Sequence, residues 1–165
     1  MDRQIIYQND FFNVYIDHRN VLSLKNLKGG AAVLPVTSDN KLILLNIYRA
    51  AFGKQMLEIP RGFREEGETT RLAASRELME EISGISDHYI NLGTIHPDSG
   101  IIDEELAIYL ALNVTWDITK LQSEEGIKNV CLLDFSDAYR MADNGEITDS
   151  FTIAALLRSK KYLLE

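Results

Sequence analysis

The sequence predicts an α/β protein in which a mixed β-sheet carries helices on its faces. Three observations lead to this prediction. Apolar residues alternate in short strand-like runs along much of the chain, few segments have helical periodicity, and 165 residues make about one domain. Apolar residues make up 45% and charged residues 25%, the usual balance of a globular protein.

The N-terminal segment has the pattern of three short strands. Residues 4–25 contain apolar runs separated by polar breaks at 8–10 and 17–20, which predicts a small antiparallel meander. Gly29 and Gly30 then interrupt the pattern. We therefore divide the chain near residue 29 into an N-terminal meander, 1–28, and a main domain, 29–165.

The main domain is predicted to alternate strands and helices. Strands at 31–36 and 41–49 flank a polar turn and are expected to form a hairpin in the core sheet. Residues 56–68 contain proline and glycines among acidic residues, which predicts a loop. A helix follows from Thr69 or Thr70 to about Ile82. The remaining elements are strands at about 89–95, 104–114 and 129–134, and helices at about 136–143 and 149–162, the last after a cap at Asp149-Ser150.

Composition excludes several classes of function. A net charge of -8 argues against a surface that grips nucleic acid, and it is compatible with a substrate that arrives with Mg²⁺. A single cysteine, Cys131, excludes a disulfide framework. The N-terminus has no apolar signal core, and no stretch approaches the roughly 20 apolar residues that span a bilayer. We expect a cytoplasmic protein that binds neither nucleic acid nor membrane.

The predicted helix before Ser83 has an acidic face. Because each helical residue turns about 100°, Glu77, Glu80 and Glu81 fall within a narrow arc. Like charges at this spacing repel, and Arg76 can pair with Glu80 to compensate only part of the repulsion. A Mg²⁺ or Mn²⁺ ion would offset the rest, since these cations prefer carboxylate oxygens. A merely solvated face is the alternative. The opposite, buried face is expected to hold Leu72, Leu78, Met79 and Ile82.

The spacing around this helix favours the metal. Gly62 is followed after five residues by Glu68, and after seven more by Arg76-Glu77-Leu78-Met79-Glu80-Glu81. This pattern resembles the box of the nudix hydrolases, which implies the nudix fold, an α/β/α sandwich with a mixed sheet. The last glycine of the box should fall at position 83, but it stands one place later, at Gly84. We expect Gly84 to end the helix with an altered C-cap and the metal site to be intact.

The resemblance implies a role for each box residue. Gly62 lets the backbone turn tightly, so that the carbonyl of Arg61 can point at the metal. Glu77 and Glu81 are implied as direct ligands, and Glu80 as a ligand or near-ligand. Arg76 with Glu68 is implied to hold the preceding loop against the helix, for which a plain surface ion pair is the alternative.

Other segments are similar to the ADP-ribose pyrophosphatases of this family. Residues 57–62, Leu-Glu-Ile-Pro-Arg-Gly, resemble their Leu-Glu-Leu-Pro-Ala-Gly, and 97–104 resemble their Pro-Ser-Pro-Gly-Phe-Ser-Asp-Glu. Substrate contacts are implied for Arg49, which falls where the subfamily has a phosphate-binding arginine, and for Glu58 and Glu104. Arg61 replaces the usual small residue, which adds either a cation beside the phosphates or a solvated side chain.

The general base is assigned to a short acidic loop. In the subfamily this loop supplies a further metal ligand and the base, and here it is reduced to Ser123-Glu124-Glu125-Gly126. We choose Glu125 over Glu124 because it lies nearer the strand that begins at Ile127. Glu77 and Glu104 are alternative bases, and a solvated glutamate pair is the alternative for the loop.

The expected reaction is metal-dependent hydrolysis of the pyrophosphate bond of a nucleoside diphosphate derivative, which for ADP-ribose gives AMP and ribose 5-phosphate. The metal neutralises the phosphates and a carboxylate takes the proton from the attacking water. GDP- or UDP-sugars, dinucleoside polyphosphates and NADH are alternative substrates. A non-catalytic nucleotide sensor is the alternative of another class, although all four box glutamates are present.

We also predict a homodimer. Residues 1–28 have apolar side chains on both faces of a meander too small to fold alone. The related enzymes use such a segment to pair subunits and to bind the base. Strands that simply cover the protein's own core are the alternative.

Overall fold

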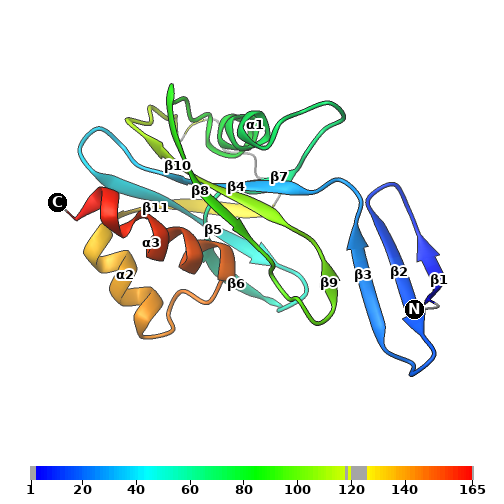
Figure 1. The fold of residues 1–165 in the computed structure, drawn as a ribbon. Helices are drawn as coiled ribbons and strands as arrows, with labels where there is room; N and C mark the ends of the chain where they lie inside the picture. Colours follow the sequence, from blue (N-terminus) through cyan, green and yellow to red (C-terminus); the bar gives the residue numbers. More distant parts are fainter. Residues whose placement is uncertain (1–2, 118, 120–125, 165) are drawn as a thin grey trace.

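The computed structural model describes residues 3–117, 119 and 126–164. The fold begins with three antiparallel strands at one end of the molecule (Figure 1). β1 (Arg3–Gln8), β2 (Phe12–Asp17) and β3 (Leu22–Asn26) pair in chain order, which confirms the predicted meander. The short strand β9 (Ile102–Asp103) extends the sheet beside β3 in parallel. β9 thus connects the meander to the main body.

The main body contains two further sheets. The first has the strand order β7 (Arg61–Phe63), β4 (Gly30–Pro35), β10 (Leu106–Leu112) and β8 (His88–Ile95). β10 is parallel to β4 and antiparallel to β8, so this sheet is mixed, as predicted. The second sheet is antiparallel and has the order β11 (Ile127–Asp134), β5 (Lys41–Arg49) and β6 (Lys54–Glu58).

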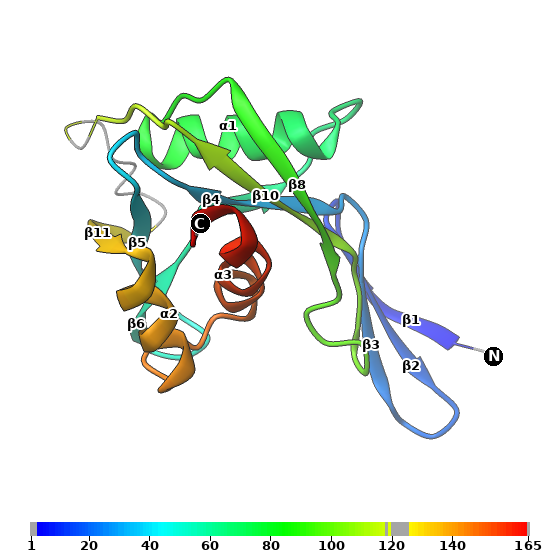
Figure 2. The ribbon, with the colours of Figure 1, turned by 60° about the vertical axis from the view of Figure 1, so that its left-hand side comes forward.

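Helices cover opposite sides of the body (Figures 1 and 2). α1 (Thr70–Ile82) lies on one side, and α2 (Phe135–Asp143) and α3 (Ser150–Leu163) lie on the other. β4 is buried on both faces: Ala31 and Val33 belong to the core cluster beneath α1, and Ala32 and Leu34 to the cluster beneath α3. This is the predicted α/β/α arrangement. None of the helices in the described residues is long and apolar enough to cross a bilayer.

Two strand predictions are wrong. β4 and β5 do not form a hairpin, because β7 and β10 occupy both edges of β4, and β5 lies in the other sheet. A bridge between Val36 and Leu42 is the pairing found where the two strands separate. The segment 56–68 is not entirely loop, since it contains the end of β6 and all of β7. β7 depends on β4, a partner distant in sequence, so local composition did not reveal it, whereas β6 forms a hairpin with the preceding strand β5 that the sequence analysis missed.

Candidate active site

Helix α1 presents two buried carboxylates. Its first turn is capped by Thr69, whose side chain accepts a hydrogen bond from the Leu72 amide. Glu77 and Glu81 are only 6% and 3% exposed. They are spaced four residues apart, so both fall on the face that packs against the sheet. Burial of two carboxylates on one helix face requires compensation by positive charge or hydrogen bonds.

The buried face of α1 is rotated from the predicted one. Leu78 and Ile82 are buried as expected, but Leu72 and Met79 are 52% and 44% exposed. The helix instead buries Ala73, Ala74, Glu77, Leu78, Glu81 and Ile82. The fully buried Ala73 and Ala74 therefore share the inward face with the two glutamates.

The end of α1 also differs from the prediction. Ser83, not Gly84, takes the left-handed conformation, with φ 50°, and the amides of Ser83 and Gly84 donate to Met79 and Leu78 carbonyls. Gly84 is required for space instead, because a β-carbon there would approach Leu78 Cγ to 2.8 Å. The altered cap was therefore predicted correctly, but not the residue that forms it.

Arg76 joins the acidic helix to the preceding loop. Its Nη1 donates to Glu77 Oε1 and Glu80 Oε2, both at 2.8 Å. Its Nε and Nη2 donate to Glu68, and Nη2 also donates to the Phe63 carbonyl at 2.6 Å. Burial by itself would lower the pKa of Arg76, but its hydrogen bonds to the Glu68 and Glu77 carboxylates outweigh this effect and raise that pKa.

Strand β7 lies directly against the Glu77 carboxylate. A β-carbon at Gly62 would overlap that carboxylate, so the close approach depends on glycine. Arg61, the residue whose carbonyl was predicted to bind metal, precedes Gly62 and pairs with Ala32 of β4. The box glycine and the first glutamate of the helix motif are thus in contact in the fold.

The donor set fits a hard divalent cation in its chemistry, and two of its three carboxylates, Glu77 and Glu81, are buried. Glu77, Glu80 and Glu81 offer only oxygen, which Mg²⁺ and Mn²⁺ prefer. In the described part of the chain, however, no three acidic, histidine or cysteine side chains converge into a preformed metal cluster. Arg76 holds Glu77 and Glu80, while Glu81 is near enough to Arg49 to help raise its pKa, after the larger effect of Glu58. A bound cation would therefore have to draw these carboxylates together.

A second cluster surrounds Glu58, at the end of β6. This carboxylate is 1% exposed and accepts from Arg49 Nε and Nη2 and from Arg61 Nη2, at 2.6 to 3.1 Å. Burial would raise the pKa of Glu58, but the hydrogen bonds and charges of the two arginines lower it. Glu58 is thus an ionised counterion shared by two guanidinium groups.

Arg61 is not a solvated side chain, contrary to one of the two possibilities raised by the sequence. It lies over the Phe151 ring, 4.4 Å from its centroid, and its Nη2 is 3.6 Å from Asp149 Oδ1. Burial raises the pKa of Asp149, an effect that the Arg61 charge opposes. The side chain is therefore held between an aromatic ring and two acidic groups.

Two cavities meet at strand β7. One, of about 390 Å³, is lined by Arg49, Glu104 and the aromatic rings of Phe12, Phe63 and Phe151. The other, of about 720 Å³, is lined by Arg76, Glu77 and Glu80 among other charged residues. Arg61, Gly62 and Phe63 line both cavities. The fold thus gathers an aromatic and cationic space beside an acidic one.

The position of Glu104 depends on a residue that the sequence analysis did not identify. Asn26, 8% exposed, donates from Nδ2 to Glu104 Oε1. Its Oδ1 accepts from the Lys28 and Gly29 amides, which orients the side chain. No sequence signal links Asn26 to a partner so distant along the chain.

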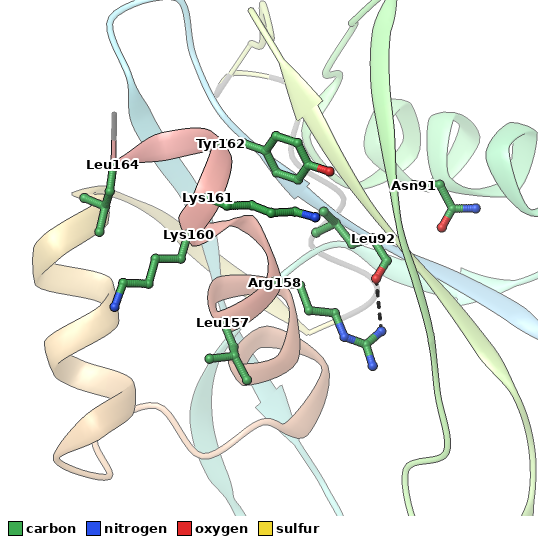
Figure 3. A pocket seen from close by; sticks show the side chains of 8 residues that line it. All are labelled: Asn91, Leu92, Leu157, Arg158, Lys160, Lys161, Tyr162 and Leu164. Atoms are coloured by element: carbon green, nitrogen blue, oxygen red, sulfur yellow. Dashed lines mark hydrogen bonds between the residues drawn. The ribbon is translucent and has the colours of Figure 1, made fainter.

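Another cavity, of about 650 Å³, lies between α3 and β8 (Figure 3). Its polar lining is mainly cationic, with Arg158, Lys160 and Lys161, and Arg158 donates to the Leu92 carbonyl. No predicted site residue lines it. The carboxylates that could hold a metal are elsewhere, so we place the candidate chemistry at β7 and α1.

The two glutamates predicted to supply the general base, Glu124 and Glu125, lie outside the residues that the structure describes.

A family model, curated relatives and a solved structure all match this chain. A model of the NUDIX domain matches residues 27–154. The chain is 29% identical over 130 residues to an ADP-ribose pyrophosphatase of Bacillus subtilis and 30% identical over 130 residues to a methanol dehydrogenase activator of Bacillus methanolicus. Each alignment covers 78% of this chain and 70% of the relative. A crystal structure of an ADP compounds hydrolase superposes with a TM-score of 0.76 at 16% identity, covering 99% of this chain and 92% of that one.

Proposed function

The chain belongs to the NUDIX family, and on this premise we propose that it hydrolyses ADP-ribose to AMP and ribose 5-phosphate. Family membership and the relatives described above make it a pyrophosphohydrolase. The observation that carries the proposal is the burial of Glu77 and Glu81 on one face of α1, with Gly62 packed against Glu77. The choice of ADP-ribose is supported by the two relatives named ADP-ribose pyrophosphatase, from Bacillus subtilis and Mycobacterium tuberculosis.

Nudix hydrolases generally use divalent metal ions, and we propose Mg²⁺ or Mn²⁺ here. Bound at this site, the cation would neutralise the diphosphate and position the attacking water. Glu77 and Glu81 would hold it, with Glu80 beside them and the Arg61 carbonyl as a further oxygen donor. Arg76 and Glu68 would keep the loop before α1 in place.

The substrate would extend across β7. The aromatic cavity suits a nucleobase or sugar, because the rings of Phe12, Phe63 and Phe151 line it. Arg49 would contact a phosphate, and Glu104 would accept hydrogen bonds from substrate hydroxyls. Glu58 is buried and would not contact the substrate directly. It would instead hold the Arg49 guanidinium in position through their ion pair. GDP- and UDP-sugars, dinucleoside polyphosphates and NADH are the alternative substrates.

The proposed proton acceptor is Glu125, with Glu124, Glu77 and Glu104 as alternatives. Carboxylates bound to a cation are poor bases because the cation lowers their proton affinity. Replacing the base by glutamine should lower kcat by roughly 10²–10⁴ with little change in KM. Glu125→Gln and Glu124→Gln distinguish the first two. If both variants remain within about threefold of the parent, Glu104→Gln is the next test.

The experiment that tests the proposal is an assay of nucleoside diphosphate derivatives with Mg²⁺ and with Mn²⁺. Release of AMP from ADP-ribose, abolished by a chelator and restored by the metal, is the expected result. Faster cleavage of a GDP- or UDP-sugar would replace the substrate but keep the reaction. Tight binding of ADP-ribose with no cleavage of any compound would support the nucleotide sensor instead.

A further inference from the structure

Arg61 lies between the two cavities at β7. It lines the aromatic cavity of about 390 Å³ and the acidic cavity of about 720 Å³. In a nucleoside diphosphate derivative the diphosphate lies between the nucleoside and the second group. If the nucleoside occupies the aromatic cavity and the phosphates face the α1 glutamates, the diphosphate passes beside Arg61.

Two guanidinium groups meet at the same point. Arg49 Nη2 lies 2.6 Å from Glu58 Oε2, and Arg61 Nη2 lies 2.8 Å from the same oxygen. Glu58 is 1% exposed, and both of its guanidinium partners line the aromatic cavity. Glu58 thus serves two guanidinium groups at once, with Asp149 as a further acidic group 3.6 Å from Arg61 Nη2.

The guanidinium of Arg61 is held in place but has unused donors. Its plane is supported by the Phe151 ring, and its contacts with Glu58 and Asp149 are both made by Nη2. Its Nε is buried and has no hydrogen-bond partner among the described residues. A guanidinium has five N–H donors, and a buried donor without a partner is costly. Phosphate oxygens are suited to satisfy such donors in a planar, paired geometry.

We propose that Arg61 is a second diphosphate-binding residue, which acts with Arg49 as a pair of guanidinium groups held by Glu58. The inference rests on the proposed function for the identity of the ligand. Arg61 stands where the resemblance to the ADP-ribose pyrophosphatases implies a small residue, so the second guanidinium departs from that pattern. It makes the contribution of the diphosphate to substrate binding larger than Arg49 alone would provide.

The test compares Arg61→Gln with Arg140→Gln. Glutamine at 61 keeps a polar donor near Glu58 and removes the charge. Arg140 is the control, because its side chain is 61% exposed on α2 and its ion pairs, with Asp137 and Glu146, are 3.4 and 3.8 Å long. Binding of ADP without metal is measured by calorimetry, together with binding of adenosine, which has no phosphate. KM and kcat are measured for the best substrate of the panel.

Arg61→Gln should weaken ADP binding by about 10- to 100-fold and raise KM similarly, with adenosine binding unchanged. Arg140→Gln should change neither. ADP binding by Arg61→Gln within twofold of Arg140→Gln would overturn the inference. Should Arg61→Gln not fold, Arg61→Lys replaces it, with an expected intermediate loss from its single-point charge. If the parent cleaves no member of the panel, the proposed function fails, whereas the ADP comparison still decides the role of Arg61.

Discussion

Glu81 is one of the two buried carboxylates proposed to bind the metal ion. It is 3% exposed on the face of α1 that also buries Glu77. Glu81→Gln removes a carboxylate from the proposed cation and should nearly abolish turnover, because several kcal/mol of transition-state stabilisation depend on the charge. Steady-state kinetics and metal titration test this, with the exposed Glu146→Gln as control. Retention of more than a tenth of kcat at unchanged KM, a loss below about 1.4 kcal/mol, would exclude Glu81 as a ligand.

Ser83 is a residue in a conformation that favours glycine. Its φ is 50°, and the residue after it is a glycine whose φ is not positive. Ser83→Gly should relieve the left-handed strain and stabilise the fold by about 0.5–1 kcal/mol, after the extra entropy of the unfolded chain is subtracted. The measurement is urea unfolding. A lower stability of the variant would mean that the serine side chain contributes more than its strain costs.

At the scale of elements, helix α3 holds the segment that bears Glu58 and Arg61. Thr152, fully buried in the first turn of α3, accepts from the Ile59 amide at 3.1 Å and donates to Asp149 at 2.7 Å. Asp149 also caps the helix through the Thr152 amide. One hydrogen bond of the Thr152 hydroxyl therefore ties the start of α3 to Ile59, directly after β6, and the other holds the Asp149 cap in place.

Thr152→Val keeps the shape of the side chain but removes that hydroxyl. It should destabilise the fold by about 1–3 kcal/mol, since the Ile59 amide and the Asp149 carboxylate each lose a buried partner. Thr152→Ser retains the hydroxyl and serves as control, with a smaller loss from the missing methyl group. Chemical denaturation measures both, and equal losses in the two variants would assign the effect to packing alone.

At the scale of the whole molecule, the N-terminal sheet leaves several large apolar side chains exposed. β1 is its edge strand and is exposed throughout, with Ile5, Ile6 and Tyr7 between 45% and 58% exposed. These three exposed side chains do not cover the protein's own core, which was the alternative role for the N-terminal strands. We propose that this surface pairs with a second copy of the chain, and that residues 1–28 bind the base as well.

Sedimentation at micromolar concentration should therefore detect a dimer, and Ile6→Lys should shift it toward monomer. Leu157→Lys is a control on α3, where an equally apolar and 61% exposed side chain lies away from the meander. A parent protein that sediments as a monomer would refute the proposal. So would a dimer that Leu157→Lys disrupts and Ile6→Lys does not.

The sequence by itself determined the elements with strong local patterns and the family to which the chain belongs. The meander, α1, the two C-terminal helices and the acidic box could be predicted because periodicity, caps and motif spacing are local properties. Only the tertiary structure decided the pairing of β4 with β7 and β10, the rotation of the buried face of α1, and the contacts of Arg61 with Asp149 and Phe151 and of Asn26 with Glu104. These features depend on contacts between segments far apart in the chain, whose packing free energy no local pattern reports.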